Sequence, residues 1–166
     1  MVYLKQRRLK KGPILNLGLF NEVPIHSGIS QPQAFSNAFN LIQASEALDY
    51  DTLWLGENHF SLPWSLSASP LALASAIAAS TKRIRIGTSV QVLPLWDPIR
   101  VAEETATVDQ ISQGRLEFGV GRSGLGYPYR VHGIPYTESR ARFLESLDVI
   151  TKAWTEDSFS YEGSFY

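Results

Sequence analysis

The sequence predicts an α/β fold built around a parallel sheet. Apolar runs typical of buried strands alternate with segments in which apolar residues recur at helical spacing. This unit, a strand followed by a helix, occurs four times, roughly every 30 to 40 residues. Units of this kind form parallel sheets with right-handed crossovers. Two architectures fit the pattern: a (β/α) barrel, of which four units are half, and a flavodoxin-like open sheet.

The first predicted unit consists of a strand over 14–20 and a helix that begins at Ser30. The run 14–20 is mostly apolar, which suits a strand that is buried on both faces. Ser30 can cap the helix, Pro32 suits its first turn, and Gln33 can complete a capping box.

Three further units follow the same plan, with strands over 52–56, 83–88 and 116–120 and helices from Ser69, Asp97 and about Thr137. The third helix ends near Gly114, a residue type favoured just beyond a helix. A long loop separates the fourth strand from its helix. The tail 159–166 alternates aromatic with small or polar residues, which predicts the start of a short strand or hairpin.

Composition excludes several classes of function. The chain has 166 residues, 15 Lys and Arg against 16 Asp and Glu, and no cysteine. This length suits one globular domain with its own core. The near-neutral charge argues against a nucleic-acid binder, and the lack of cysteine excludes disulfides, thiolate catalysis and cysteine-ligated metals.

Positive charge is concentrated at the amino end, where residues 1–12 contain lysine and arginine but no acid. We interpret 1–12 as a basic, solvated extension before a domain over 13–166; the alternative is an arm that binds a membrane surface or nucleic acid. No apolar run resembles a signal segment or a membrane span, so we expect a cytoplasmic protein without membrane contact.

Polar residues follow each predicted strand, where ligands bind in both candidate architectures. They suggest a cleft for a polar, anionic ligand, although loop residues are commonly polar: Asn21, Glu22, Glu57, Asn58, His59, Ser89, Gln91, Arg122 and Ser123. His59 is of interest because it stands beside Glu57 at a strand end. His26 and His132 are expected to be solvated or structural. No two histidines have the spacing of a metal site, so none is predicted.

The run 119–124 matches Gly-x-Gly-x-x-Gly, but no helix opens directly after it as a dinucleotide fingerprint requires. We interpret these glycines as allowing close approach to a ligand whose phosphate Arg122 binds. Arg140 lies in the first turn of a predicted helix, where a cation is unfavourable. An anion shared by Arg122 and Arg140 would remove this conflict; the alternative is a salt bridge from Arg140 to Glu138 or a neighbouring acid.

The most specific signal is a set of motifs in uninterrupted order. They are Leu-Trp-Leu-Gly-Glu-Asn-His-Phe at 53–60, Ile-Arg-Ile-Gly-Thr at 84–88 leading to Val-Leu-Pro at 92–94, Ala-Glu-Glu at 102–104 with Val-Asp-Gln-Ile-Ser-Gln-Gly-Arg at 108–115, the glycine-rich run 119–124, and Ser139-Arg140. Together they make residues 15–166 resemble the bacterial luciferase-like, flavin-utilising monooxygenase family.

This resemblance implies a (β/α)8 TIM barrel, of which 13–166 is the amino-terminal half with about the first four βα units. It implies that reduced FMN, or the deazaflavin F420 in some branches, binds at the carboxyl ends of the strands. Arg122 and Arg140 match positions that hold the flavin phosphate, and Val90 and Gly121 match positions that line the isoalloxazine ring. The implied cofactor-binding set is Val90, Gly121, Arg122, Ser123 and Arg140.

The same resemblance implies that Glu57, Asn58 and His59 are the catalytic residues. Luciferases carry Glu-His-His-Phe where this chain has Glu-Asn-His-Phe, so Asn58 replaces their first histidine while His59 is retained. Luciferases also have a cysteine at the position of Gly121.

The implied function is oxygenation of a small organic substrate with reduced FMN and O2, through a flavin C4a-hydroperoxide, with reduced flavin supplied by a separate flavin reductase. An F420-dependent hydride-transfer oxidoreductase is the first alternative. The second is a non-catalytic fragment that associates into dimers, and a homodimer is expected because the family typically dimerises through helices of this half.

Overall fold

The computed structural model describes residues 15–166, so the predicted extension 1–12 and the first residue of the predicted strand 14–20 lie outside the described residues. Its main sheet is parallel, four-stranded and ordered β1-β2-β3-β5: β1 (Gly18–Asn21), β2 (Thr52–Leu55), β3 (Arg85–Thr88) and β5 (Leu116–Glu117). A second parallel pair joins β4 (Gln91–Val92) to β6 (Val120–Gly121). The predicted α/β class with a parallel sheet is confirmed.

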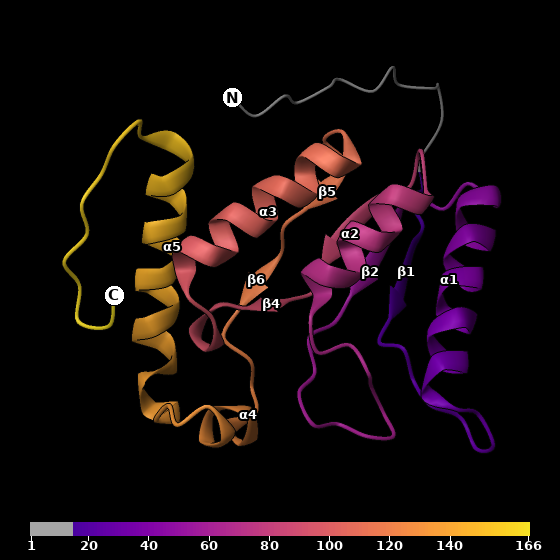
Figure 1. The fold of residues 1–166 in the computed structure, drawn as a ribbon, viewed down its shortest axis with the longest axis horizontal. Coiled ribbons are helices and arrows are strands. Elements are labelled where there is room, and N and C mark those ends of the chain that lie inside the picture. The colour runs from indigo at the N-terminus through magenta and orange to yellow at the C-terminus, as the bar shows by residue number, and fades with distance from the viewer. Residues whose placement is uncertain (1–14) are drawn as a thin grey trace.

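Helices pack in a row along the sheet (Figure 1): α1 (Gln31–Ala47), α2 (Pro70–Ser80), α3 (Pro98–Ser112) and α5 (Ser139–Thr155). Within this row α2 contacts both α1 and α3, and α3 contacts α5. The shorter elements are the 3-10 turns η1 (Leu93–Leu95) and η2 (Tyr136–Glu138) and the helix α4 (Gly126–Val131). None of the helices within 15–166 combines the length and apolarity that crossing a bilayer requires.

The helix starts agree with the capping signals in the sequence. Ser30 caps α1, because its hydroxyl accepts a hydrogen bond from the backbone N–H of Gln33 at 3.4 Å. Asp97 caps α3 in the same way, through Arg100 N at 2.9 Å. The predicted capping box is wrong: the Gln33 amide donates to Asn37 at 2.9 Å, one turn further along the helix.

The core lies between the helices and one face of the sheet. A cross-strand row on this face contains Leu53 and Ile86, both 0% exposed, and continues into the partly buried residues Leu19 and Leu116. The opposite face is less covered, and Phe20 there is 51% exposed. The prediction that the first strand is buried on both faces is therefore wrong, because in the part of the chain that the structure describes helices pack on only one side of it.

The predicted strand 116–120 divides into β5 and β6. At the break, the Thr88 hydroxyl donates to Gly119 O at 2.7 Å and accepts from Gly119 N at 3.0 Å. A Cβ atom at Gly119 would lie 2.2 Å from Thr88 O, so only glycine allows this approach. The strand therefore leaves β3 after Glu117 and pairs with β4 from Val120 onward.

Two further predictions are corrected. The loop predicted after the fourth strand contains α4, and Pro128 lies within its first turn, where a missing N–H has no helical partner to lose. The tail 159–166 forms no strand. Its backbone N–H groups at Ser164 and Phe165 donate instead to the Glu145 carboxylate on α5, each at 3.0 Å.

Candidate functional site

The predicted site residues lie beyond the carboxyl ends of the strands. The loops after β1 and β2 reach the same end of the molecule as α4, the lower end in Figure 1. This is the edge of a parallel sheet at which ligands bind in barrels and open sheets.

Glu57 is the most deeply buried charged group at this edge, with a side chain that is 0% exposed. Its Oε1 accepts from Trp96 Nε1–H and its Oε2 accepts from the backbone N–H of Val92, each at 2.7 Å. The Nε2 atom of His59 lies 2.7 Å from Oε1. Because the indole and backbone groups only donate, both carboxylate oxygens act as acceptors, and this network assigns the hydrogen of the third bond to His59 Nε2.

His59 is enclosed by three rings. Phe60 and Trp96 each lie 6.3 Å from it between ring centroids, and His132 lies 5.5 Å away in an edge arrangement at 77°. The sequence predicted that His132 is a solvated or structural loop residue. The structure places it at the end of α4 and against His59, so it joins the candidate site although its ring is exposed.

Asn58 is turned toward the loop after β1. Its Nδ2 donates to Glu22 Oε1 at 2.7 Å, and its backbone N–H donates to Ser67 O at 2.8 Å. A Cβ atom at Gly56 would lie 3.2 Å from the same Glu22 oxygen. Asn58 therefore joins two loops, and its partner Glu22 is a site residue that the resemblance did not single out.

Arg122 forms a second cluster with hydroxyl groups. Its guanidinium donates to Ser139 Oγ at 3.1 Å and to Tyr136 Oη at 3.3 Å, while its backbone oxygen accepts from the Tyr129 hydroxyl. Burial and the neighbouring Tyr136 raise the pKa of Tyr129 to about 12, so this phenol stays protonated and donates at neutral pH. The Arg122 side chain itself remains exposed, and a ligand can reach it.

Arg140 is exposed and lies one residue after Ser139, the partner of Arg122. The alternative of a salt bridge from Arg140 to Glu138 or a neighbouring acid is wrong, because Glu138 pairs with Arg142 at 2.9 Å and no ion pair within residues 15–166 includes Arg140. An anion shared with Arg122 stays a prediction.

The residues expected to line a flat ring are in mutual contact. A Cβ atom at Gly121 would lie 2.6 Å from Val90 Cγ2, so a side chain at 121 requires Val90 to move. The Ser89–Val90 peptide is cis, and Ser123 has a left-handed φ of 60°. The neighbouring Gln91 is 2% exposed, and its Oε1 has no hydrogen-bond partner within the part of the chain that the structure describes.

Helix α4 connects the two clusters. Tyr129 bonds to Arg122, Tyr127 packs against Phe60 at 6.1 Å between centroids, and the helix ends at His132. The sequence pattern did not predict α4. The signal that could have found it is Gly133, whose φ of 69° is the left-handed conformation that terminates helices.

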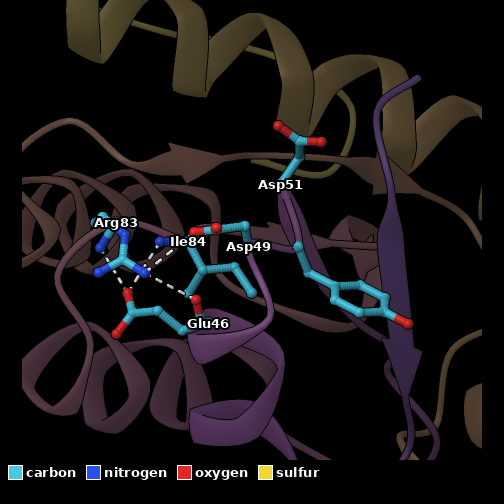
Figure 2. Close-up of a pocket in the computed structure, with 6 residues that line it drawn as sticks. Glu46, Asp49, Asp51, Arg83 and Ile84 are labelled. Carbon is cyan, nitrogen blue, oxygen red and sulfur yellow. Dashed lines mark hydrogen bonds and ion pairs between the residues drawn. The ribbon is translucent and has the colours of Figure 1, made fainter. Parts of the chain in front are cut away.

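Hollows are also found away from this site. The first, about 220 Å³, is at the amino ends of β2 and β3, where Figure 2 shows Glu46 and Arg83 turned toward each other. There Glu46 Oε1 accepts from the backbone N–H groups of residues 82–84, which is a structural contact. The second, about 600 Å³, lies between the start of α3 and the tail. Within 15–166, no three His, Asp or Glu side chains are arranged to hold a metal ion.

The model of the family described as luciferase-like monooxygenase matches residues 15–166. The alkanal monooxygenase alpha chain of a Kryptophanaron alfredi symbiont is 34% identical over 132 residues, which cover 80% of this chain and 37% of that protein. The oxygenase component of the flavin-dependent trigonelline monooxygenase of Acinetobacter baylyi is 30% identical over 139 residues, covering 82% of this chain and 38% of that protein.

Solved structures show the same fold. Monooxygenase RslO1 from Streptomyces bottropensis superimposes with a TM-score of 0.86 at 29% identity, covering 92% of this chain and 46% of its own. The oxygenating constituent of 3,6-diketocamphane monooxygenase from Pseudomonas putida, in complex with FMN, gives 0.85 at 23% identity, covering 92% and 44%. This chain spans less than half the length of these proteins, which fits a partial barrel, and it belongs to the luciferase-like monooxygenase family.

Proposed function

We propose that this protein binds reduced FMN and uses O2 to oxygenate a small organic substrate, with reduced flavin supplied by a separate flavin reductase. The observation that carries the proposal is the arrangement of the Arg122 cluster and the buried Glu57–His59 pair, which α4 connects at one edge of the sheet. The relative named as an oxygenase component and the similar fold solved with FMN support it.

The residues present fit the chemistry of FMN. A phosphate monoester suits the planar fork of Arg122, and the hydroxyls of Tyr136 and Ser139 beside it are further donors. A flat ring suits the contact surface of Val90 and the side-chain-free Gly121. Among the described residues, no donor reaches the buried acceptor Gln91 Oε1, and an N–H group of a ring or substrate would satisfy it.

Reduced FMN, when bound, supplies the electrons that activate O2. The protein binds and orients it: Arg122, Ser123 and Arg140 hold the phosphate end, and Val90 and Gly121 contact the ring. At the other cluster, Glu57 fixes the ring of His59 in one tautomer, so that Nδ1 is the nitrogen that can take up a proton. Phe60 and Trp96 flank the His59 ring and limit the access of water to it.

The test is anaerobic titration of the chain with reduced FMN. Arg122→Met is expected to weaken binding by about 10- to 150-fold, because a charge-assisted contact is worth roughly 1.5–3 kcal/mol. Arg100→Met is the matched control, since Arg100 is an exposed arginine on α3 whose ion-pair partners among residues 15–166 are the helix residues Glu103 and Glu104. The Arg100→Met variant is expected to bind reduced FMN with the same affinity as the unchanged chain.

Two outcomes contradict the proposal. Tighter binding of F420 than of FMN would favour an F420-dependent hydride-transfer oxidoreductase. Binding of neither, in a folded chain, would favour a non-catalytic module. If flavin binds as expected, oxidation of NAD(P)H in the presence of the protein should require an added flavin reductase.

A further inference from the structure

The ring of His59 has little direct contact with solvent. Its side chain is 9% exposed, and the rings of Phe60, Trp96 and His132 surround it. A group that exchanges protons from such a position needs a neighbour that can pass them on.

Only one of these three neighbours can carry a proton. Phe60 has no titratable atom, and the single N–H of Trp96 is donated to Glu57 at 2.7 Å. His132 has two ring nitrogens, is exposed to solvent, and lies with its ring 5.5 Å from that of His59. Within residues 15–166, it is the sole ring against His59 that both accepts and releases protons.

The Glu57 network determines which nitrogen of His59 takes part. Nε2–H is committed to Glu57 Oε1, since Trp96 and Val92 already donate to the same carboxylate. No hydrogen bond within the described residues uses Nδ1, so this atom is free to accept a proton. A carboxylate that holds one nitrogen of a histidine both fixes the tautomer and stabilises the imidazolium that forms.

We propose that His132 is the solvent-side member of a proton path whose inner members are His59 and Glu57. A proton from solvent binds His132 and passes through a bridging water to Nδ1 of His59. His59 becomes an imidazolium that keeps its Nε2–H bond to Glu57, and the carboxylate compensates the added charge. Release from Nδ1 along the same path restores the neutral ring, with one proton moved and no bond to Glu57 broken.

The path is tested by NMR on the chain labelled with 15N-histidine. Long-range 1H–15N spectra report the tautomer of His59, and exchange broadening of its Nδ1 signal reports the rate at which that nitrogen takes up and releases a proton. His132→Phe, which keeps a ring in place, and His132→Gln are each expected to slow this exchange by about tenfold or more while leaving the Nε2–H tautomer unchanged. Free imidazole added to either variant should restore the rate.

His26→Phe is the control, because His26 is an exposed loop histidine and makes no ring contact with His59 among the described residues. An exchange rate unchanged by both His132 variants would overturn the proposal. So would a changed tautomer, which would mean that His132 only packs against His59.

A part for this path in oxygenation rests on the proposed function, but the experiment uses no flavin. Slowed exchange in a chain that fails to bind FMN would leave the path standing and remove the flavin proposal. Flavin binding together with unchanged exchange would do the reverse.

Discussion

Tyr129 combines a core position with a role next to the candidate phosphate site. Its side chain is fully buried, its ring meets Tyr136 edge-on at 5.1 Å between centroids, and its hydroxyl donates to the backbone oxygen of Arg122. One residue thus holds α4 to the segment that carries Arg122. Its contribution can be separated from packing, because phenylalanine keeps the ring and removes only the donor.

Tyr129→Phe is expected to lower the free energy of unfolding by about 1 kcal/mol at neutral pH, the usual net value of one hydrogen bond. The pKa of Tyr129 is raised to about 12 from an ordinary value of 10.0. Its stabilising effect is therefore fully present below pH 10 and is lost as the pH rises through the higher value. Urea unfolding at pH 7 and at alkaline pH measures both effects. If the Tyr129→Phe variant lost as much unfolding free energy at alkaline pH as the unchanged chain does, the effect would not come from Tyr129.

For single residues, the sequence predicted contacts of the candidate site only between residues that are close together in the chain. Glu57 and His59 are two positions apart and do form a pair. Trp96 and Val92, which complete the environment of Glu57, come from a segment that periodicity does not relate to the second strand. His132 arrives through a short helix, so its approach to His59 depends on a tertiary contact that no local pattern records.

Among the elements, the connections at the amino ends of the strands depend on Arg115. This half-buried side chain donates to the backbone oxygens of Ser112, Ile84, Ala78 and Thr81 and to the Thr81 hydroxyl. Burial lowers the pKa of its guanidinium. The cation lies at the carboxyl end of α2, where it opposes the helix dipole favourably. Arg115 therefore joins α2, α3, β3 and β5.

Arg115→Met is expected to cost about 3 kcal/mol of unfolding free energy, because it leaves several carbonyl groups without donors while keeping the apolar stem. Arg100→Met, at a side chain that is 69% exposed, should change it by no more than about 0.5 kcal/mol. Denaturant unfolding of both variants measures the difference. Equal stability of the two would show that water replaces the lost guanidinium.

Long elements with capping residues were predictable, and short ones were not. The starts of α1 and α3 follow from Ser30 and Asp97, whose side chains accept from the first turn of each helix. The two-residue strands β4 and β6 are too short for a period to appear, and the break before β6 is caused by Thr88, far away in the sequence. The barrel type was inferred from motifs, since periodicity left an open sheet equally possible.

Considering the molecule as a whole, one face of the main sheet lacks, within residues 15–166, the cover that helices give the other face. On this less covered face, a cross-strand row runs from Phe20 through Trp54 and Gly87 to Glu117. The Trp54 indole lies directly over Gly87, where a Cβ atom would be 2.3 Å away, but Phe20 at the edge strand is 51% exposed. An exposed apolar residue beside the unpaired edge of a strand favours association with another chain.

We therefore expect the 166-residue chain to self-associate, and we propose a homodimer as the smallest assembly that covers this face. Phe20→Lys, which places a charge beside the open edge, should shift sedimentation equilibrium toward monomer. Leu41→Lys is the matched control, because Leu41 is similarly exposed, at 45%, but lies on α1. A folded chain that stays monomeric at every concentration would contradict the expectation. If both substitutions shifted the homodimer toward monomer to the same extent, the interface would lie on the helices and not on the sheet.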